Sequence, residues 1–112
     1  MLTIEKEIFN RAKKLQLQDE ARMFPWVVRK MRGDYDVYIG RGSKWGNPFV
    51  IGPGHNREDV VRSYICYILN NKKLLKALPL LYNKSLGCFC APLLCHGHVL
   101  RALLELRSKL CC

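Results

Sequence analysis

Residues 86–98, LGCFCAPLLCHGH, gather five side chains that can act as nucleophiles, bases or metal ligands: Cys88, Cys90, Cys95, His96 and His98. Because side chains alternate along a strand, Cys88 and Cys90 are expected on one face of the strand that this segment predicts. Cys95 then falls at the start of a predicted helix, where unpaired backbone N–H groups and the helix dipole lower the pKa of a thiol. A reactive cysteine is therefore expected at Cys95.

Three roles for this cluster stay open. Cysteine catalysis would use Cys95 as the nucleophile, with His96 or His98 as the acid or base. A zinc site would draw on Cys88, Cys90, Cys95 and one of the two histidines. Its spacing lacks the C-x2-C pattern, and the adjacent side chains of Cys95 and His96 would have difficulty facing one ion. In a structural role, the cysteines are small apolar side chains of a buried strand and a histidine caps the helix.

A second segment, IGRGSKWGNPF at residues 39–49, combines glycines with cations and hydrogen-bonding groups: Arg41, Ser43, Lys44 and Asn47. Glycines allow close backbone approach and positive φ angles, so this combination suits an anion. Trp45 either offers its indole face to a base or another flat ring, or fills the core beneath the loop. Neither of the standard glycine-rich phosphate-binding motifs occurs here.

The elements that position these segments follow from the spacing of apolar residues. Helical spacing covers residues 3–22, 58–71, 72–83 with a break at Pro79, and 96–110, and strand patterns cover 24–31, 35–40 and 86–90. A turn is expected at Arg32-Gly33-Asp34 and a long, shaped loop at 41–59.

Strands separated by helices predict an α/β fold, with a small, partly parallel sheet flanked by helices. We expect one compact domain, in which residues 1–34 supply the N-terminal helix and first strand and residues 35–110 form the core.

The two polar segments each follow a predicted strand, and ligands of open α/β sheets bind beyond the carboxyl ends of the strands. If the strands that end at Gly40 and Cys90 are parallel neighbours, both loops face one pocket. The lining expected for it is Arg41, Lys44, Trp45, Asn47, Cys95, His96 and His98. Such a set suits a phosphate-bearing aromatic compound.

Composition adds broader expectations. The chain has 112 residues, and 19 Lys and Arg against 9 Asp and Glu give it a formal net charge of +10. This charge favours an anionic partner, with nucleic acid among the alternatives. No apolar run reaches the roughly 18 residues of a membrane span. Without a recognisable signal peptide, the six cysteines indicate an intracellular, reducing compartment rather than a disulfide scaffold. A prenylation signal at Cys111-Cys112 is not favoured.

Two motifs in this sequence also carry a resemblance. The segments DVYIGRGSKWGNPF and LGCFCAPLLCHGHVL resemble the family called domain of unknown function 4326, which occurs in bacteria, phages and large DNA viruses. The resemblance covers residues 35–107 and implies an α/β fold with a site formed by the paired motifs. The family pattern usually has an acidic residue after the Cys-His-Gly triplet, where this chain has His98. The strand, Cys-His turn and helix are also similar to another family, domain of unknown function 488.

Together these observations predict a domain that binds a nucleotide or nucleotide-like phosphate and, if Cys95 and His96 act on it, processes it. Arg41 and Lys44 would hold the phosphate, Trp45 would stack on the base and Asn47 would orient the ligand. No cofactor is expected. The alternatives are a basic nucleic-acid-binding module and a zinc-stabilised interaction domain.

Overall fold

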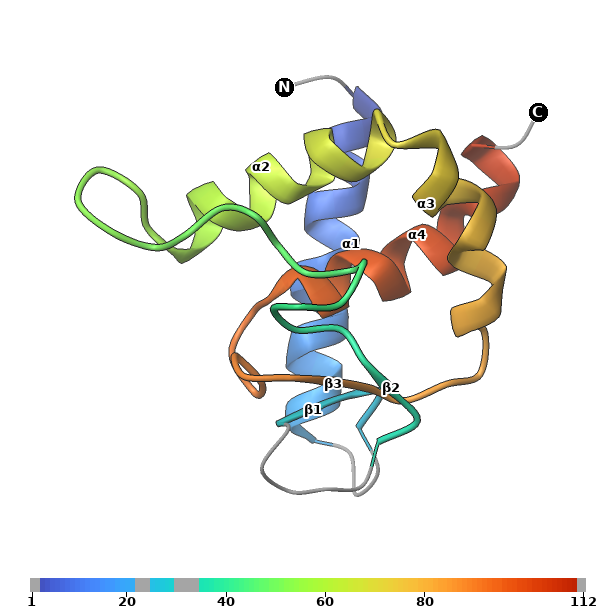
Figure 1. Ribbon diagram of the computed structural model, residues 1–112, viewed down its shortest axis with the longest axis horizontal. Coiled ribbons are helices and arrows are strands. Elements are labelled where there is room, and N and C mark those ends of the chain that lie inside the picture. Colours follow the sequence, from blue (N-terminus) through green and yellow to red (C-terminus); the bar gives the residue numbers. More distant parts are fainter. Residues whose placement is uncertain (1–2, 22–24, 30–34, 111–112) are drawn as a thin grey trace.

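A computed structural model describes residues 3–21, 25–29 and 35–110 of the chain (Figure 1). The helices are α1 (Thr3–Glu20), α2 (Arg57–Leu69), α3 (Lys72–Ala77), the 3-10 helix η2 (Leu78–Leu81) and α4 (His96–Leu110). The strands are β1 (Val27–Arg29), β2 (Val37–Tyr38) and β3 (Leu86–Cys88). These elements confirm the α/β fold. The predicted turn at 32–34 and the terminal Cys111-Cys112 lie outside the described residues.

The three strands form one parallel sheet in the order β1-β3-β2. Val27 and Val37 both pair with Leu86, from opposite sides of β3. The sheet predicted as partly parallel is thus parallel throughout its described strands, and β2 and β3 are the parallel neighbours that the pocket hypothesis requires. The central strand β3 is fully buried between β1 and β2, and the ring of Tyr35 packs directly on Gly87, where a Cβ would come within 2.5 Å of it.

Side chains directly before the first turn fix where α2 and α3 begin. Asn56 and Asp59 form a reciprocal capping box that starts α2, one residue earlier than the apolar spacing predicts. Asn71 caps α3, and Pro79 lies in the first turn of η2, where its missing N–H removes no helical hydrogen bond. The predicted break at Pro79 is therefore a change from α-helix to 3-10 helix.

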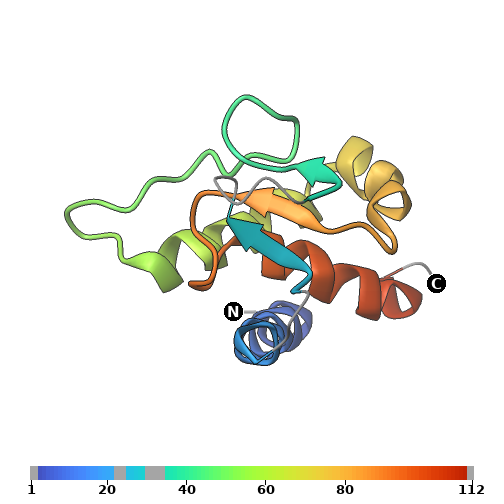
Figure 2. The ribbon, with the colours of Figure 1, turned by 90° about the horizontal axis from the view of Figure 1, so that it is seen from below.

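Helix α4 lies at the centre of the fold. It crosses α1 (Figure 1), and the sheet packs against it when the molecule is seen from below (Figure 2). Its apolar face is completely buried, and the surrounding core takes side chains from every layer: Ile8, Ile39, Trp45, Tyr64, Ile65, Leu86, Val99, Leu100 and Leu103. None of the described helices combines the length and the apolar composition that a membrane crossing requires.

Candidate functional site

A pocket of about 240 Å³ opens at the carboxyl ends of β2 and β3, where the two polar segments meet. Most of its wall is apolar, from Phe49 on the 41–56 loop to Phe89 and Leu94 after β3. The polar and sulfur-bearing side chains in the wall are Arg41, Asn47, Arg57, Cys88, Cys90, Cys95 and His96. The two segments therefore line one pocket, as their positions after neighbouring strands predict.

Four predicted ligand-binding residues lie elsewhere. Of the described residues, those in the pocket wall do not include Ser43, Lys44, Trp45 or His98. The Ser43 hydroxyl donates to the Gly40 carbonyl at 2.7 Å and so closes the loop turn. Lys44 is exposed, with its Nζ 5.4 Å from the centre of the Trp45 ring.

The prediction that Trp45 offers an exposed face for stacking is wrong. Its side chain is only 3% exposed and belongs to the core, so the alternative role as a core residue beneath the loop applies. The buried Tyr64 hydroxyl donates to the Trp45 carbonyl at 2.7 Å and fixes the loop over α2. Asn47 reinforces this connection, because its side-chain amide donates to the Val60 carbonyl at 3.2 Å while its oxygen accepts from the Phe49 N–H. Asn47 thus lines the pocket and also holds the loop against α2.

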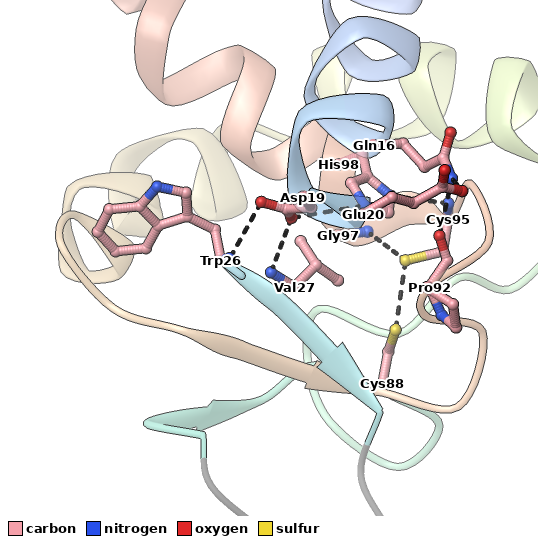
Figure 3. A network of polar contacts seen from close by, with 10 residues as sticks. All are labelled: Gln16, Asp19, Glu20, Trp26, Val27, Cys88, Pro92, Cys95, Gly97 and His98. Atoms are coloured by element: carbon pink, nitrogen blue, oxygen red, sulfur yellow. Dashed lines mark hydrogen bonds and ion pairs between the residues drawn. The ribbon is translucent and has the colours of Figure 1, made fainter. Parts of the chain in front are cut away.

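Two thiols meet in the pocket wall. The Sγ atoms of Cys88 and Cys95 are 3.3 Å apart, and Gly97 donates its N–H to Cys95 Sγ at 3.3 Å (Figure 3). The hydrogen bond with the Cys95 thiol, with the backbone N–H groups of Ala91 and Cys90 and the charge of Arg57, lowers the pKa of Cys88 to about 7 despite burial. The hydrogen bond with Cys88 and complete burial raise the pKa of the Cys95 thiol. The more acidic thiol is therefore Cys88, whereas the sequence indicated Cys95.

His96 is a neutral base at the inner end of the pocket. Its Nε2 lies 2.7 Å from the Ile39 carbonyl, which can only accept, so Nε2 carries the proton and Nδ1 is the acceptor. Burial lowers the pKa of this ring, and Tyr64 packs edge-on against it with 5.0 Å between ring centroids. The ring is held in one orientation by these two contacts.

His98 faces away from the pocket, because positions two residues apart on a helix point in nearly opposite directions. Its Nδ1 accepts the Cys95 backbone N–H at 3.1 Å, while Cys95 Sγ accepts from Gly97 inside the helix. Together these bonds form a thiol–imidazole version of the capping box. In this box His98 takes the place of the usual acidic residue, because its ring accepts the N–H of the capping residue Cys95. The prediction that His98 lines the pocket is wrong.

A buried carboxylate joins this cap to the sheet. Asp19 accepts the N–H groups of Trp26 and Val27 at 3.2 and 3.1 Å, and its Oδ2 lies 3.8 Å from His98 Nε2 (Figure 3). The end of α1, the start of β1 and the first turn of α4 are thus connected through one side chain. Burial lowers the pKa of His98 to about 4, so its ring is neutral at pH 7.

Arg57 is a pocket residue that the motifs did not predict. It is the first residue of α2, and its Nη1 donates at 3.3 Å to the carbonyl of Leu94, which also lines the pocket. The signal that would have placed it is the Asn56-x-x-Asp59 pattern before an apolar run, which indicates a helix start. The pocket phenylalanines Phe49 and Phe89 carry no comparable signal.

The geometry of the same side chains bears on the zinc hypothesis. Among the described residues, no group of three His, Cys, Asp or Glu side chains is arranged to hold a metal ion. Cys88 and Cys95 contact each other, whereas His96 is bound to the Ile39 carbonyl.

Comparison with known proteins identifies the family. Residues 27–106 match the model of the family described as "Domain of unknown function (DUF4326)", so the chain belongs to that family and the resemblance of its two motifs is confirmed. An "Uncharacterized 12.4 kDa protein in nrdA-td intergenic region" of Enterobacteria phage T4 is 35% identical over 78 residues, which cover 66% of this chain and 71% of the phage protein. No solved structure matches the chain.

Proposed function

We propose that the pocket at the ends of β2 and β3 binds a nucleotide or a nucleotide-like phosphate. The observation that carries this proposal is that Arg41 and Arg57, which come from different segments, line one mostly apolar pocket. Two cations beside an apolar wall suit a ligand in which a phosphate is joined to a flat ring. The family and the phage relative supply no activity, so the proposal depends on the site alone.

The anionic end of the ligand would lie between the two arginines. Guanidinium groups bind phosphate oxygens through paired N–H donors. Two acidic residues in the first turn of α2 are bound within the helix itself. Asp59 accepts the Asn56 N–H at 2.9 Å, and Glu58 lies 3.7 Å from the Arg62 guanidinium. The anion would therefore be held by the two guanidinium groups that line the pocket rather than by the start of the helix.

The flat end of the ligand would lie against the pocket phenylalanines, not against Trp45. Phe49 and Phe89 are 42% and 52% exposed, large fractions for aromatic side chains. Phe89 is supported edge-on by Tyr38, with 6.3 Å between ring centroids, so its ring face is held in place. Stacking of a base on such a ring contributes about 1–3 kcal/mol.

Chemistry on the bound ligand would involve Cys88 rather than Cys95. Cys88 has the lowered pKa, and its sulfur and the neutral His96 ring line the same pocket. A covalent step would therefore use Cys88 as the nucleophile and His96 Nδ1 as a proton acceptor.

A thermal-shift screen with mono-, di- and cyclic nucleotides tests the proposal. A ligand at about tenfold above its Kd stabilises the folded state by about 1.4 kcal/mol, which raises the Tm of a chain this size by about 5 °C. Loss of the shift in Arg57→Ala but not in Arg107→Ala, an exposed arginine near the end of α4, supports the pocket. The absence of any shift at millimolar nucleotide contradicts it.

The same variants separate this function from nucleic-acid binding driven by the +10 charge. Non-specific binding of DNA or RNA falls steeply as salt rises and depends on the total number of cations. It would be weakened equally by Arg57→Ala and Arg107→Ala. Pocket binding predicts weaker salt dependence and an effect of Arg57 only.

A further inference from the structure

We infer that Cys88 and Cys95 form a redox-active dithiol, which becomes a disulfide by exchange with a small anionic disulfide that enters the pocket. This activity uses the same pocket as the proposed function but requires no nucleotide, so the two can fail separately.

The geometry of the sulfur pair carries the inference. Cys88 ends β3 and Cys95 precedes α4, and the six residues between them bring the two Sγ atoms to 3.3 Å. A disulfide bond is about 2.0 Å long, so the sulfurs need to approach by only about 1.3 Å. Both side chains are almost completely buried, and both residues line the pocket. The two thiols are therefore positioned to form a disulfide with each other when an incoming disulfide oxidises them.

The surroundings assign different roles to the two sulfurs. The two thiols share one hydrogen bond, and together with backbone N–H groups and the charge of Arg57 this bond lowers the pKa of Cys88 to about 7, so Cys88 is the thiol that ionises first. A thiolate is the form that attacks a disulfide, so Cys88 is the attacking sulfur. Cys95, whose sulfur lies within contact of Cys88, is the resolving thiol.

Exchange would proceed in two balanced steps. The Cys88 thiolate attacks one sulfur of the incoming disulfide, which forms a mixed disulfide and releases one small thiolate. That thiolate takes up the proton that Cys95 gives up. The Cys95 thiolate then attacks the Cys88 sulfur and expels the second small thiolate, which is protonated by water. The protein dithiol is oxidised, and the small disulfide is reduced to two thiols.

The charge of the pocket selects the kind of disulfide. Arg41 and Arg57 line the same wall as the two sulfurs, and no described carboxylate lies in that wall. A disulfide that carries carboxylates is attracted to such a site, and attraction of this kind raises rates of association by tenfold or more at low salt. Glutathione disulfide has this chemistry and is a practical probe.

The test uses a variant with Cys66, Cys90, Cys111 and Cys112 replaced by serine, so that only the pair remains. Treatment with glutathione disulfide is expected to lower the intact mass by two hydrogen atoms, with no glutathione retained and full recovery with dithiothreitol. Adding Cys95→Ser should trap one glutathione on Cys88. Two thiols that stay free to alkylation, or a stable adduct on each, would overturn the inference.

Two further measurements keep the result independent of that variant. Peptide mapping of the treated natural chain should find the Cys88–Cys95 cross-link, and its absence beside other disulfides would contradict the inference. Arg57→Ala should slow oxidation by glutathione disulfide about tenfold more than oxidation by neutral hydroxyethyl disulfide. Equal slowing of oxidation by the two disulfides would refute the preference of the pocket for an anionic disulfide. Disulfide formation without any nucleotide-induced thermal shift would refute the proposed function alone, and the reverse result would refute the dithiol alone.

Discussion

Acidification should destabilise this protein through His98. Its ring is buried and neutral, with Nδ1 accepting the Cys95 N–H and Nε2 near Asp19. Burial lowers its pKa from 6.5 to about 4 in the folded state. Between these two values the unfolded chain binds more protons than the folded one. Stability from this residue is therefore complete above about pH 6.5 and is lost as the pH falls towards 4.

The size of the effect follows from the difference between the two pKa values. It approaches about 3 kcal/mol as the pH nears 4, and this value is a ceiling because the Asp19 carboxylate favours the charged ring. Burial also lowers the pKa of His96, which adds a loss of the same sign. A protein of this size has a total stability of about 5–15 kcal/mol, so the loss is easily measured.

The assay is urea unfolding of the natural chain and of His98→Gln between pH 7.5 and 4.5. Glutamine keeps an oxygen that can accept the Cys95 N–H but does not titrate in this range. The natural chain should lose about 2–3 kcal/mol more than the variant across this interval. The exposed His55→Gln is the matched control and should follow the natural chain. Parallel curves for the natural chain and His98→Gln would refute the buried, neutral state of His98.

Two substitutions and one control test the loop that frames the pocket. Gly46→Ala would place a Cβ 2.9 Å from the Gly40 carbonyl oxygen, so we expect urea unfolding to show a loss of about 1–3 kcal/mol. Gly52→Ala has open space around it and should change stability by less than about 0.5 kcal/mol; an equal loss in both variants would contradict the close packing. Tyr64→Phe leaves the buried Trp45 carbonyl without its 2.7 Å hydrogen bond and should cost about 1–3 kcal/mol. An unchanged unfolding midpoint for Tyr64→Phe would show that this bond does not hold the loop.

The secondary structure was predictable where apolar spacing is regular. Helix α4 has the predicted bounds because its apolar face repeats at helical spacing through Val99, Leu100 and Leu103. Strands were predicted too long, since the pairing of β1 and β2 with β3 extends over only two or three residues each. The strand order could not be predicted either, because the pattern around residues 24–40 is equally consistent with direct pairing of the first two strands.

The pocket was predictable in location but not in all the residues that line it. Two polar loops after strands indicate a shared edge, and the structure brings Arg41, Asn47, Cys95 and His96 to one pocket. Trp45 was misassigned because a local pattern cannot show whether a loop folds its aromatic residue inwards.

His98 and Arg57 show which sequence signals were available. A helix turns by about 100° per residue, so residues at positions 96 and 98 cannot face the same pocket, and this geometry alone would have separated the two histidines. Arg57 follows a recognisable N-cap and could have been placed at a helix start. That this helix start lies at the pocket depends on the path of the 41–56 loop, which no local pattern specifies.

Calorimetric titration of the natural chain, Arg57→Ala and Arg107→Ala with the nucleotide that gives the largest thermal shift tests the central claim most directly. One charged hydrogen bond to phosphate contributes about 1.5–3 kcal/mol, so Arg57→Ala should weaken binding by at least tenfold. Arg107→Ala, which removes the same charge away from the pocket, should leave Kd within about twofold of the natural value. Equal weakening in both variants, or none in either, would contradict a phosphate held at the ends of β2 and β3.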